Sequence, residues 1–311
     1  MLASTPAPGL RIGSLCSGYG GLDLAVTDVV GGSVLWHADN APAAAAVLAR
    51  HWPGVPNLGD IKTVDWQSVP PVDLVTAGYP CQPFSSAGQK KGVNDARHLW
   101  PHVARALGLL RPRWVVLENV GHHLRLGFDV VLGDLARLGF DARWCCVRAS
   151  DVGAAHERRR LFVLAWDAAV ADPAGLGPHR SRTARERRAE PAHRGPAVAD
   201  PGGAGLEVRP VEPAGHQRQT AERGGADDVG TWGHYAAAVA TQEAATRPAP
   251  RPVDDLGRLN PGFSEWLMGL PAGWVADTPG LSRTAQLTVL GNGVVPAQAA
   301  AALNALIGES W

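Results

Sequence analysis

One cysteine and one glutamate each follow a short apolar run, at a position from which a side chain can reach a ligand. Cys81 comes after the run Val72–Ala77 and lies between two prolines in Gly78-Tyr-Pro-Cys-Gln-Pro-Phe-Ser85. Because the prolines stiffen this loop and its neighbours are polar, we interpret Cys81 as a nucleophile and not as a buried core thiol. Glu118 closes the run Trp114–Glu118. A carboxylate there is costly to bury without a partner, so we expect Glu118 to face the same site.

A glycine-rich turn earlier in the chain has the composition of a cofactor loop. The turn Ser14-Leu-Cys-Ser-Gly-Tyr-Gly-Gly-Leu-Asp23 follows an apolar run and leads into a helical pattern. Its three glycines let the backbone approach a ligand in front of a helix N-terminus, although a plain tight turn fits the same residues. Asp39 follows about 20 residues later, where an acidic side chain holds a ribose, and Asp60 lies where we expect a third strand to end. Together these residues indicate a nucleoside-containing cofactor.

Apolar runs alternate with helical patterns over residues 10–166, which predicts an α/β fold. The expected strands are Leu10–Cys16, Ser33–Trp36, Val72–Ala77, Trp114–Glu118, Ala142–Val147 and Leu161–Ala165. The expected helices are Leu22–Val30, Ala43–Trp52, Leu99–Leu110 and Val130–Leu138. This alternation is typical of a parallel sheet with helices on both faces, which binds ligands outside the carboxyl ends of its strands.

The pattern changes near Asp167 and divides the chain into three expected regions. Residues 1–166 form a catalytic and cofactor-binding domain, residues 167–254 an irregular region rich in Pro, Gly, Arg and Ala, and residues 255–311 a C-terminal segment that packs back on the first domain. A rough repeat in the middle region, starting at Val170 and again at Val198, indicates a local duplication. We expect one helix from Trp232 to about Ala245 and another over Val294–Ile307.

Several motifs, in their order along the chain, resemble those of the cytosine-5 DNA methyltransferase family of bacteria and phages. They are the glycine-rich turn, Pro80-Cys81-Gln82, Glu118-Asn119-Val120, His156-Glu-Arg-Arg-Arg160, Leu259-Asn-Pro-Gly-Phe-Ser-Glu-Trp-Leu-Met-Gly-Leu-Pro271 and Gly291-Asn-Gly-Val-Val295. The resemblance covers about residues 10–166 and 255–307 and shows no family motif between them. It implies a Rossmann-like, S-adenosylmethionine-dependent methyltransferase sheet with helices on both faces, plus a smaller irregular target-recognition domain.

The resemblance also implies a reaction, the transfer of a methyl group from S-adenosylmethionine to C5 of a cytosine flipped out of duplex DNA. In that reaction the Cys81 thiolate attacks C6, and Glu118 holds the N3 and N4 edge and protonates N3. Arg158 and Arg160 steady the ring oxygen or a nearby phosphate and favour the thiolate. A base then removes the C5 proton, Cys81 departs by elimination, and S-adenosylhomocysteine is the other product.

The family motifs assign the cofactor contacts to particular residues. These are Cys16, Ser17, Gly18, Gly20 and Gly21 in the turn, Asp39 for the ribose, Asp60 and Ile61 for the adenine, and Pro80, Leu99, Asn292 and Val294 for the remainder. Three positions depart from the family pattern, with Cys16 in place of the usual Phe, His156 in place of Gln, and Ser14 in place of an early Asp. We expect these departures to change cofactor affinity more than reaction type.

The charge of the chain is zero overall, with 29 Lys+Arg against 29 Asp+Glu, but it is unevenly distributed. Residues 1–79 carry three basic residues against six aspartates (net −3), residues 85–113 carry six against one (net +5), and residues 179–194 carry six Arg against two Glu (net +4). Phosphate binding needs such local basic segments, although the second one fits a solvated face as well. The resemblance places the DNA contacts at Gln82, Ser85, Lys90, Lys91 and Arg97, in a loop that closes over DNA in this family.

Composition excludes several other classes of protein. Four cysteines without a CxxC indicate reduced thiols, so we expect neither disulfides nor a metal, and we interpret Cys145 and Cys146 as core thiols. We also interpret His122 and His123 as structural, not as a base or metal pair. Hydrophobic residues make up 45% of the chain, but we find no apolar run of ~18 residues and no leader peptide. We therefore expect a monomeric protein of the bacterial or phage-infected cytoplasm, with no membrane partner.

Two other functions remain open at this point. A tRNA cytosine-5 methyltransferase has the same fold and chemistry, but the long middle region favours duplex DNA because it is large enough to read a groove. A non-catalytic DNA-binding regulator is the second alternative, against which the intact Pro80-Cys81-Gln82 and Glu118 argue.

Overall fold

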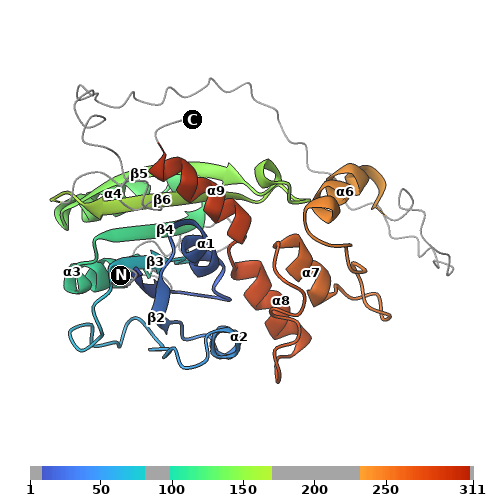
Figure 1. Ribbon diagram of the computed structural model, residues 1–311, viewed down its shortest axis with the longest axis horizontal. Helices are drawn as coiled ribbons and strands as arrows, with labels where there is room; N and C mark the ends of the chain where they lie inside the picture. The colour runs from blue at the N-terminus through green and yellow to red at the C-terminus, as the bar shows by residue number, and fades with distance from the viewer. Residues whose placement is uncertain (1–8, 81–98, 170–231, 309–311) are drawn as a thin grey trace, which may run out of the picture.

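We analysed a computed structural model, which describes residues 9–80, 99–169 and 232–308. Its centre is a six-stranded sheet in the order β2-β1-β3-β4-β6-β5 (Figure 1). The strands are β1 (Arg11–Leu15), β2 (Ser33–Ala38), β3 (Leu74–Ala77), β4 (Trp114–Val120), β5 (Phe140–Arg148) and β6 (Arg159–Asp167). All six expected strands are confirmed, each with slightly different ends. The expected third strand before Asp60 is wrong, because only a single bridge from Asn57 to His37 forms there.

The expectation of an entirely parallel sheet is also wrong. Strands β1 to β4 pair in parallel, but β6 runs antiparallel to both β4 and β5. The physical reason is the connection between β5 and β6, which holds only the ten residues from 149 to 158 and a short 3₁₀ helix, Ser150–Val152. A parallel pair needs a crossover long enough to return the chain to the other end of the sheet, whereas a short connection joins antiparallel strands.

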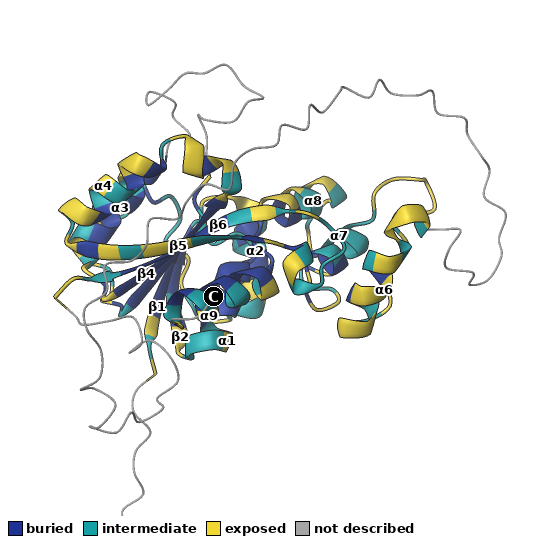
Figure 2. Ribbon diagram, turned by 90° about the horizontal axis from the view of Figure 1, so that it is seen from above, coloured by how far each residue is buried: buried dark blue, intermediate teal, exposed yellow. Residues whose placement is uncertain are grey.

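Helices cover both faces of the sheet, as expected (Figure 2). One face packs against α3 (Trp100–Leu110) and α4 (Phe128–Arg137), and the other against α1 (Gly21–Val30) and α9 (Pro296–Ile307). Successive side chains along a strand therefore enter opposite cores. Val75 lies in the α3/α4 core and its neighbour Leu74 in the α1/α9 core, because successive strand side chains point to opposite faces.

The helices begin where the local sequence favours a helix start. Pro42 and Pro296 occupy the first turns of α2 (Pro42–His51) and α9, where a missing N–H costs nothing. Asn260 caps α7 (Pro261–Leu267) by accepting a hydrogen bond from Gly262 N. Ser282 caps α8 (Arg283–Asn292) in the same way through Ala285 N.

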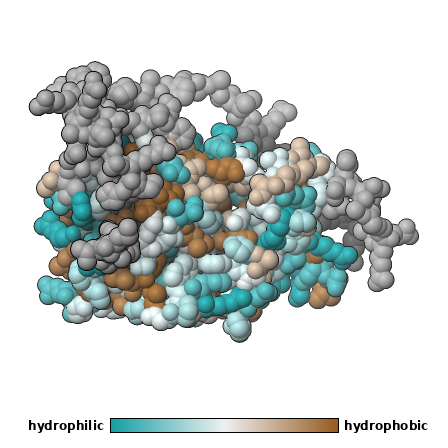
Figure 3. Space-filling model, viewed as in Figure 1, coloured by the Kyte–Doolittle hydropathy of each residue, from teal (hydrophilic) through white to brown (hydrophobic). Residues whose placement is uncertain are grey.

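The C-terminal helices surround a third apolar cluster beside the sheet domain. Met268, Leu270, Val275 and Val289 pack there with Tyr19 and Val47. The middle region ends in a 3₁₀ turn (Gly233–Tyr235) and α6 (Ala236–Ala245). On the face drawn in Figure 3, hydrophilic residues predominate over the part that contains α7 and α8, whereas hydrophobic ones gather over the sheet domain.

By length and composition, one described segment could cross a membrane, Arg283–Ile307. Half of its most apolar 18-residue stretch is buried inside the protein. The segment consists of two helices, α8 and α9, which are separated at residues 293–295. The core helices of proteins that never enter a membrane pass the same test. The packing of α9 against α1 and the sheet accounts for its apolar sequence.

Candidate active site and cofactor cavity

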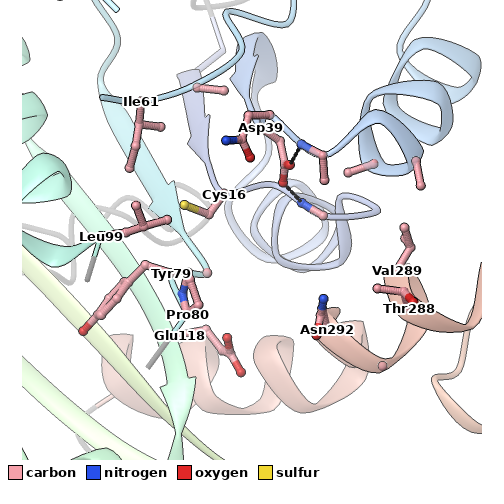
Figure 4. A pocket seen from close by; sticks show the side chains of 18 of the residues that line it. Cys16, Asp39, Ile61, Tyr79, Pro80, Leu99, Glu118, Thr288, Val289 and Asn292 are labelled. Carbon is pink, nitrogen blue, oxygen red and sulfur yellow. Dashed lines mark hydrogen bonds between the residues drawn. The ribbon is translucent and has the colours of Figure 1, made fainter. Parts of the chain in front are cut away.

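A cavity of about 980 Å³ opens where the carboxyl ends of the parallel strands meet α2 and α8 (Figure 4). The strand order reverses beside β1, whose neighbours are β2 and β3, and open α/β sheets bind ligands at such a reversal. Most of the predicted site residues line this cavity, namely Cys16, Gly18, Asp39, Asp60, Ile61, Pro80, Leu99, Glu118, Arg158, Arg160 and Asn292.

The turn after β1 is built to bring its backbone to the cavity. Cys16 and Gly18 adopt left-handed conformations, with φ of 52° and 57°. A side chain on Gly18 would meet nothing within 4 Å, so its positive φ and not packing favours glycine there, and the open space leaves room for a ligand beside the backbone. Asp39 fixes the turn, because its carboxylate accepts hydrogen bonds from Gly18 N and Ala41 N, both at 2.9 Å. Burial raises the pKa of Asp39, and these two bonds oppose the rise.

The other predicted residues of the turn serve the packing around it and do not line the cavity. Side chains added at Gly20 or Gly21 would collide with Trp52 or with the Val294 carbonyl, respectively. Ser17 Oγ bonds back to the Ser14 carbonyl at 3.2 Å. Val294 is buried at 6% exposure and likewise does not line the cavity. The structure therefore brings these four residues close behind the cavity wall, not to its surface.

An acidic and an apolar side chain lie side by side at the far end of the cavity. Asp60 accepts hydrogen bonds from Asn40 Nδ2 at 3.2 Å and from Lys62 N at 3.0 Å. Ile61 is buried beside it, and Cys16 and Leu99 complete an apolar wall. Burial raises the pKa of the Cys16 thiol to about 12, so this side chain is neutral. The combination of carboxylates with an apolar wall fits a ribose and a purine ring.

Glu118 is the acid of the site. It lies at the carboxyl end of β4 with 6% of its surface exposed, and Arg160 Nε meets its Oε1 at 2.9 Å. Burial raises the pKa of Glu118 to about 7, against the opposing effect of Arg160 and Arg158. Such a carboxyl group can hold a proton near neutral pH and give it to a base bound beside it.

Arg158 is oriented differently from Arg160, although both line the cavity. Its guanidinium donates hydrogen bonds to two backbone carbonyls, Gly291 O at 3.0 Å and Gly293 O at 2.7 Å. These carbonyls flank Asn292, whose side chain faces the cavity from the end of α8 in Figure 4. Both terminal nitrogens of Arg158 thus contact the protein backbone, and the predicted contact with a base or phosphate stays a prediction.

Several predicted residues lie outside the described part of the chain. They are the nucleophile Cys81 and the expected DNA contacts Gln82, Ser85, Lys90, Lys91 and Arg97. Pro80, the residue before Cys81, is described and lines the cavity. Asn119 Nδ2 donates to the carbonyl of Tyr79 at 3.0 Å, which ties this stretch to β4 beside Glu118.

The sequence interpretation missed one wall of the cavity and one buried acid. The missed wall consists of Ala41–Ala44 on α2 and of Ser282, Thr284 and Thr288 on α8. The positions 284, 288 and 292 recur every four residues, a signal of one helix face that could have been recognised. The missed acid is Asp23, which accepts hydrogen bonds from Thr76 Oγ1 and Ser14 Oγ beneath the turn. Burial raises its pKa to about 6.

The histidine and cysteine pairs that we interpreted as structural have the following surroundings. Both histidines lie in a 3₁₀ helix, Gly121–Arg125, not on a strand. His122 lines the cavity, whereas His123 is buried and its ring nitrogens contact Tyr79 Oη at 3.1 Å and Leu126 O at 2.8 Å. Cys145 and Cys146 are half-buried on β5 and pack against the two cores of the sheet. Among the described residues, no cluster of three His, Cys, Asp or Glu side chains could hold a metal ion.

An open α/β sheet with a cavity at the carboxyl ends of its strands belongs to the class of folds that bind ligands at such a crevice. Within that class, residues 10–190 match the family described as C-5 cytosine-specific DNA methylase, and the chain belongs to this family.

Curated relatives match about half of the chain. Type II methyltransferase M2.BsuMI from Bacillus subtilis is 32% identical over 165 residues, which are 50% of this chain and 42% of that protein. Type II methyltransferase M.HgiCII from Herpetosiphon aurantiacus is 33% identical over 162 residues, or 50% of this chain and 36% of that protein. The matched segment thus spans about two fifths of the length of these relatives.

Solved structures match nearly the whole fold. A Spodoptera frugiperda DNMT2 mutant superposes with a TM-score of 0.57 and 18% identity over 96% of this chain and 100% of its own. A prophage-encoded putative DNA modification methyltransferase from E. coli superposes with a TM-score of 0.57 and 19% identity, over 95% of this chain and 97% of its own. At these identities the likeness concerns the fold, and it confirms the methyltransferase-type sheet expected from the sequence.

Proposed function

We propose that this protein is a DNA cytosine-5 methyltransferase that uses S-adenosylmethionine. The observation that carries the proposal is Glu118, a buried acid with a pKa near 7 that is paired with Arg160 in the cavity to which Pro80 leads. Membership of the family supports cytosine as the base, and the names of the relatives support a type II modification enzyme. We also propose that it acts in the cytoplasm of a bacterial or phage-infected cell, which the bacterial origin of the relatives supports.

The cavity fits the proposed cofactor on the evidence of its own residues. The open space at Gly18 admits a ligand against the backbone, Asp39 and Asp60 offer carboxylates, and Ile61 and Leu99 offer an apolar surface. Asn292 faces the opposite end. When bound, S-adenosylmethionine supplies the methyl group.

The residues of the chain account for the remaining steps. The Cys81 thiolate forms a bond to C6 of the cytosine, and the displaced electron pair moves toward N3, where Glu118 delivers its proton. Arg160 then stabilises the carboxylate that remains, because its Nε already lies 2.9 Å from Oε1. After methylation at C5, a base removes the C5 proton and the electron pair of that bond restores the double bond between C5 and C6. The bond between C6 and sulfur then breaks with its electron pair on sulfur, which releases Cys81 as the thiolate, and the N3 proton returns to Glu118.

We propose that residues 167–254 select the DNA sequence. Most of this region lies outside the described residues. Its last helix, α6, is tied to the catalytic domain through Gln242, whose side chain accepts from Ala155 N at 2.7 Å and donates to Trp266 O at 2.6 Å. This double anchor would hold the region beside the cavity.

Covalent trapping tests the proposal directly. DNA that carries 5-fluorocytosine should form a stable adduct with the protein in the presence of S-adenosylmethionine, because fluorine blocks the final elimination. Cys81→Ser should abolish the adduct, whereas it should leave S-adenosylhomocysteine binding unchanged. An absence of adduct with the unaltered protein, over a panel of DNA sequences, would contradict the proposal.

The tRNA alternative needs a separate measurement. Labelled S-adenosylmethionine is incubated with the protein and either genomic DNA or total tRNA. We expect label on DNA, and label on tRNA alone would replace DNA with tRNA as the substrate. Bisulfite sequencing of DNA from expressing cells then gives the target site.

A further inference from the structure

Arg158 contacts the backbone at the end of α8, which forms one wall of the cavity. The two glycine carbonyls that its guanidinium holds belong to the α8–α9 junction, which we define as residues Gly291–Val295. Because the two carbonyls stand on either side of Asn292, one rigid planar group fixes the backbone before and after that residue. A fork of parallel N–H donors suits this task better than the single point charge of a lysine.

The backbone and side chain of Arg158 are themselves held in place. Its carbonyl accepts a hydrogen bond from Gln298 Nε2 at 2.7 Å, and the same amide donates to Val147 O at 2.6 Å. Gln298 is fully buried in α9. The Nε atom of Arg158 is also covered by protein and has no hydrogen-bond partner among the described residues, so that edge of the guanidinium is not turned toward the cavity.

A second residue fixes the junction from the other side. Tyr19 Oη donates to Val294 O at 2.6 Å, and the Tyr19 ring occupies the space beside Gly293 that a side chain would need. Three carbonyl groups near Asn292, those of Gly291, Gly293 and Val294, are thus bound by Arg158 or Tyr19. The Asn292 side chain is left as the exposed polar group of the junction, and it faces the cavity.

The two arginines of the motif therefore have different partners. Arg158 lies just before β6 and Arg160 lies within it, two residues apart, a spacing that places their side chains on the same side of an extended chain. Arg160 meets the carboxylate of Glu118, whereas Arg158 meets the α8–α9 junction. Both guanidinium groups lower the pKa of Glu118, but Arg160 alone is in hydrogen-bond contact with it.

We propose that Arg158 is a positioning residue for cofactor binding: it orients Asn292 toward the bound cofactor by holding the carbonyls of Gly291 and Gly293. The proposal rests on the proposed function, because it takes the cavity to bind S-adenosylmethionine. It also links Glu118 to the α8–α9 junction. Arg160 on β6 contacts Glu118, and Arg158, two residues earlier in the chain, contacts the junction.

Arg158→Lys separates the geometry of this group from its charge. The lysine keeps the positive charge near Glu118 but cannot bridge both carbonyls in a fixed plane. We expect its Kd for S-adenosylhomocysteine, measured by isothermal titration calorimetry, to rise about tenfold. With saturating S-adenosylmethionine, the rate of trapping on 5-fluorocytosine DNA should stay within about twofold of the unaltered protein.

A double-mutant cycle with Asn292→Ala tests the connection between the two residues. Asn292→Ala alone should also raise the Kd for S-adenosylhomocysteine. The Kd of the double variant should not exceed the higher of the two single-variant Kd values. Arg159→Lys is the matched control, because Arg159 is the exposed neighbour of Arg158, and its Kd should stay within about twofold. Should Arg158→Lys fail to fold by thermal melting, Arg158→Gln takes its place for the calorimetric measurement and the cycle with Asn292→Ala; its trapping rate is not compared, because it also removes a charge that acts on Glu118.

Two results would overturn the inference. One is an unchanged Kd for Arg158→Lys combined with a slower trapping rate, which would make Arg158 a contact of the base or of DNA. The other is additive losses in the cycle, which would make Arg158 and Asn292 independent. Failure of the proposed function looks different, because then the unaltered protein would neither bind S-adenosylhomocysteine nor be trapped on DNA.

Discussion

Arg160 reaches Glu118 diagonally across two antiparallel strands, with Nε 2.9 Å from Oε1. In the register of β4 and β6, Glu118 stands opposite Phe162 and Arg160 stands opposite Val120, so the two side chains lie on the same face. Burial raises the pKa of Glu118 to about 7, and the nearby guanidinium prevents a larger rise. The register of one strand pair therefore places the guanidinium that limits the rise in this pKa.

Replacing Arg160 by methionine should move the alkaline limb of the pH–rate profile upward. The change removes a positive charge that lowers the pKa of Glu118, so its pKa should rise above 7 and the acid should stay protonated to higher pH. The measurement is the single-turnover rate of methyl transfer from about pH 6 to 9. Arg159→Met is the control and should leave the profile in place. A downward shift for Arg160→Met would mean that Glu118 does not act as the acid.

Glu118→Gln should change how stability depends on pH. The folded pKa of about 7 lies above the reference value of 4.5, so the folded state binds the proton more tightly than the unfolded chain does. The unaltered protein should therefore lose stability as the pH rises from about 4.5 to 7, and the glutamine variant should lack this loss. Urea unfolding at several pH values measures it. A stability difference between the two proteins that is constant with pH would contradict the raised pKa.

Gly293 and Gly291 offer a matched pair of substitutions in the α8–α9 junction. A methyl group at Gly293 would collide with the Tyr19 ring, so Gly293→Ala should cost about 1–3 kcal/mol of unfolding free energy. At Gly291 a methyl group meets nothing within 4 Å, and alanine favours the helix there by up to ~1 kcal/mol. Thermal and urea unfolding compare the two variants. Equal stability would show that Tyr19 moves aside at little cost.

Asp39→Asn should weaken cofactor binding by loosening the glycine-rich turn. The carboxylate accepts from Gly18 N and Ala41 N through different oxygens, and an amide keeps only one acceptor for the two donors. Loss of one such bond, at about 1.5 kcal/mol, corresponds to a roughly tenfold higher Kd for S-adenosylhomocysteine. Asp28→Asn, at an exposed position of α1, is the control. Equal affinities for the two variants would assign Asp39 no part in the site.

The sequence predicted the elements well because each has a strong local signal. Apolar runs marked the six strands, and the ends of β1, β3 and β4 placed Gly18, Pro80 and Glu118 at one edge. The antiparallel direction of β6 has a weaker signal, the short connection without a long helix before it, and it depends also on pairing across the sheet. The partner of Glu118, which comes from that strand, depends on the same pairing.

Residues that act through backbone contacts were the hardest to predict. The family pattern placed Gly20 and Gly21 at the cofactor, but the packing against Trp52 and Val294 that requires glycine there forms only when distant segments meet. Arg158 was expected at the base for a similar reason. Its partners are two backbone carbonyls that lie 133 and 135 residues further along the sequence, and no side-chain pattern marks a carbonyl.

The basic segment after Cys81 gives a prediction that depends on charge alone. Lys90, Lys91 and Arg97 lie outside the described residues, but residues 85–113 carry a net charge of +5, whereas residues 1–79 carry −3. Changing the three to glutamine should weaken DNA binding, and the slope of log K against log salt should fall by up to about 3. S-adenosylhomocysteine binding should not change, because the cavity residues stay intact. Filter binding at several salt concentrations and calorimetry measure the two effects. If cofactor affinity falls as much as DNA affinity, the segment belongs to the cofactor site and not to the DNA interface.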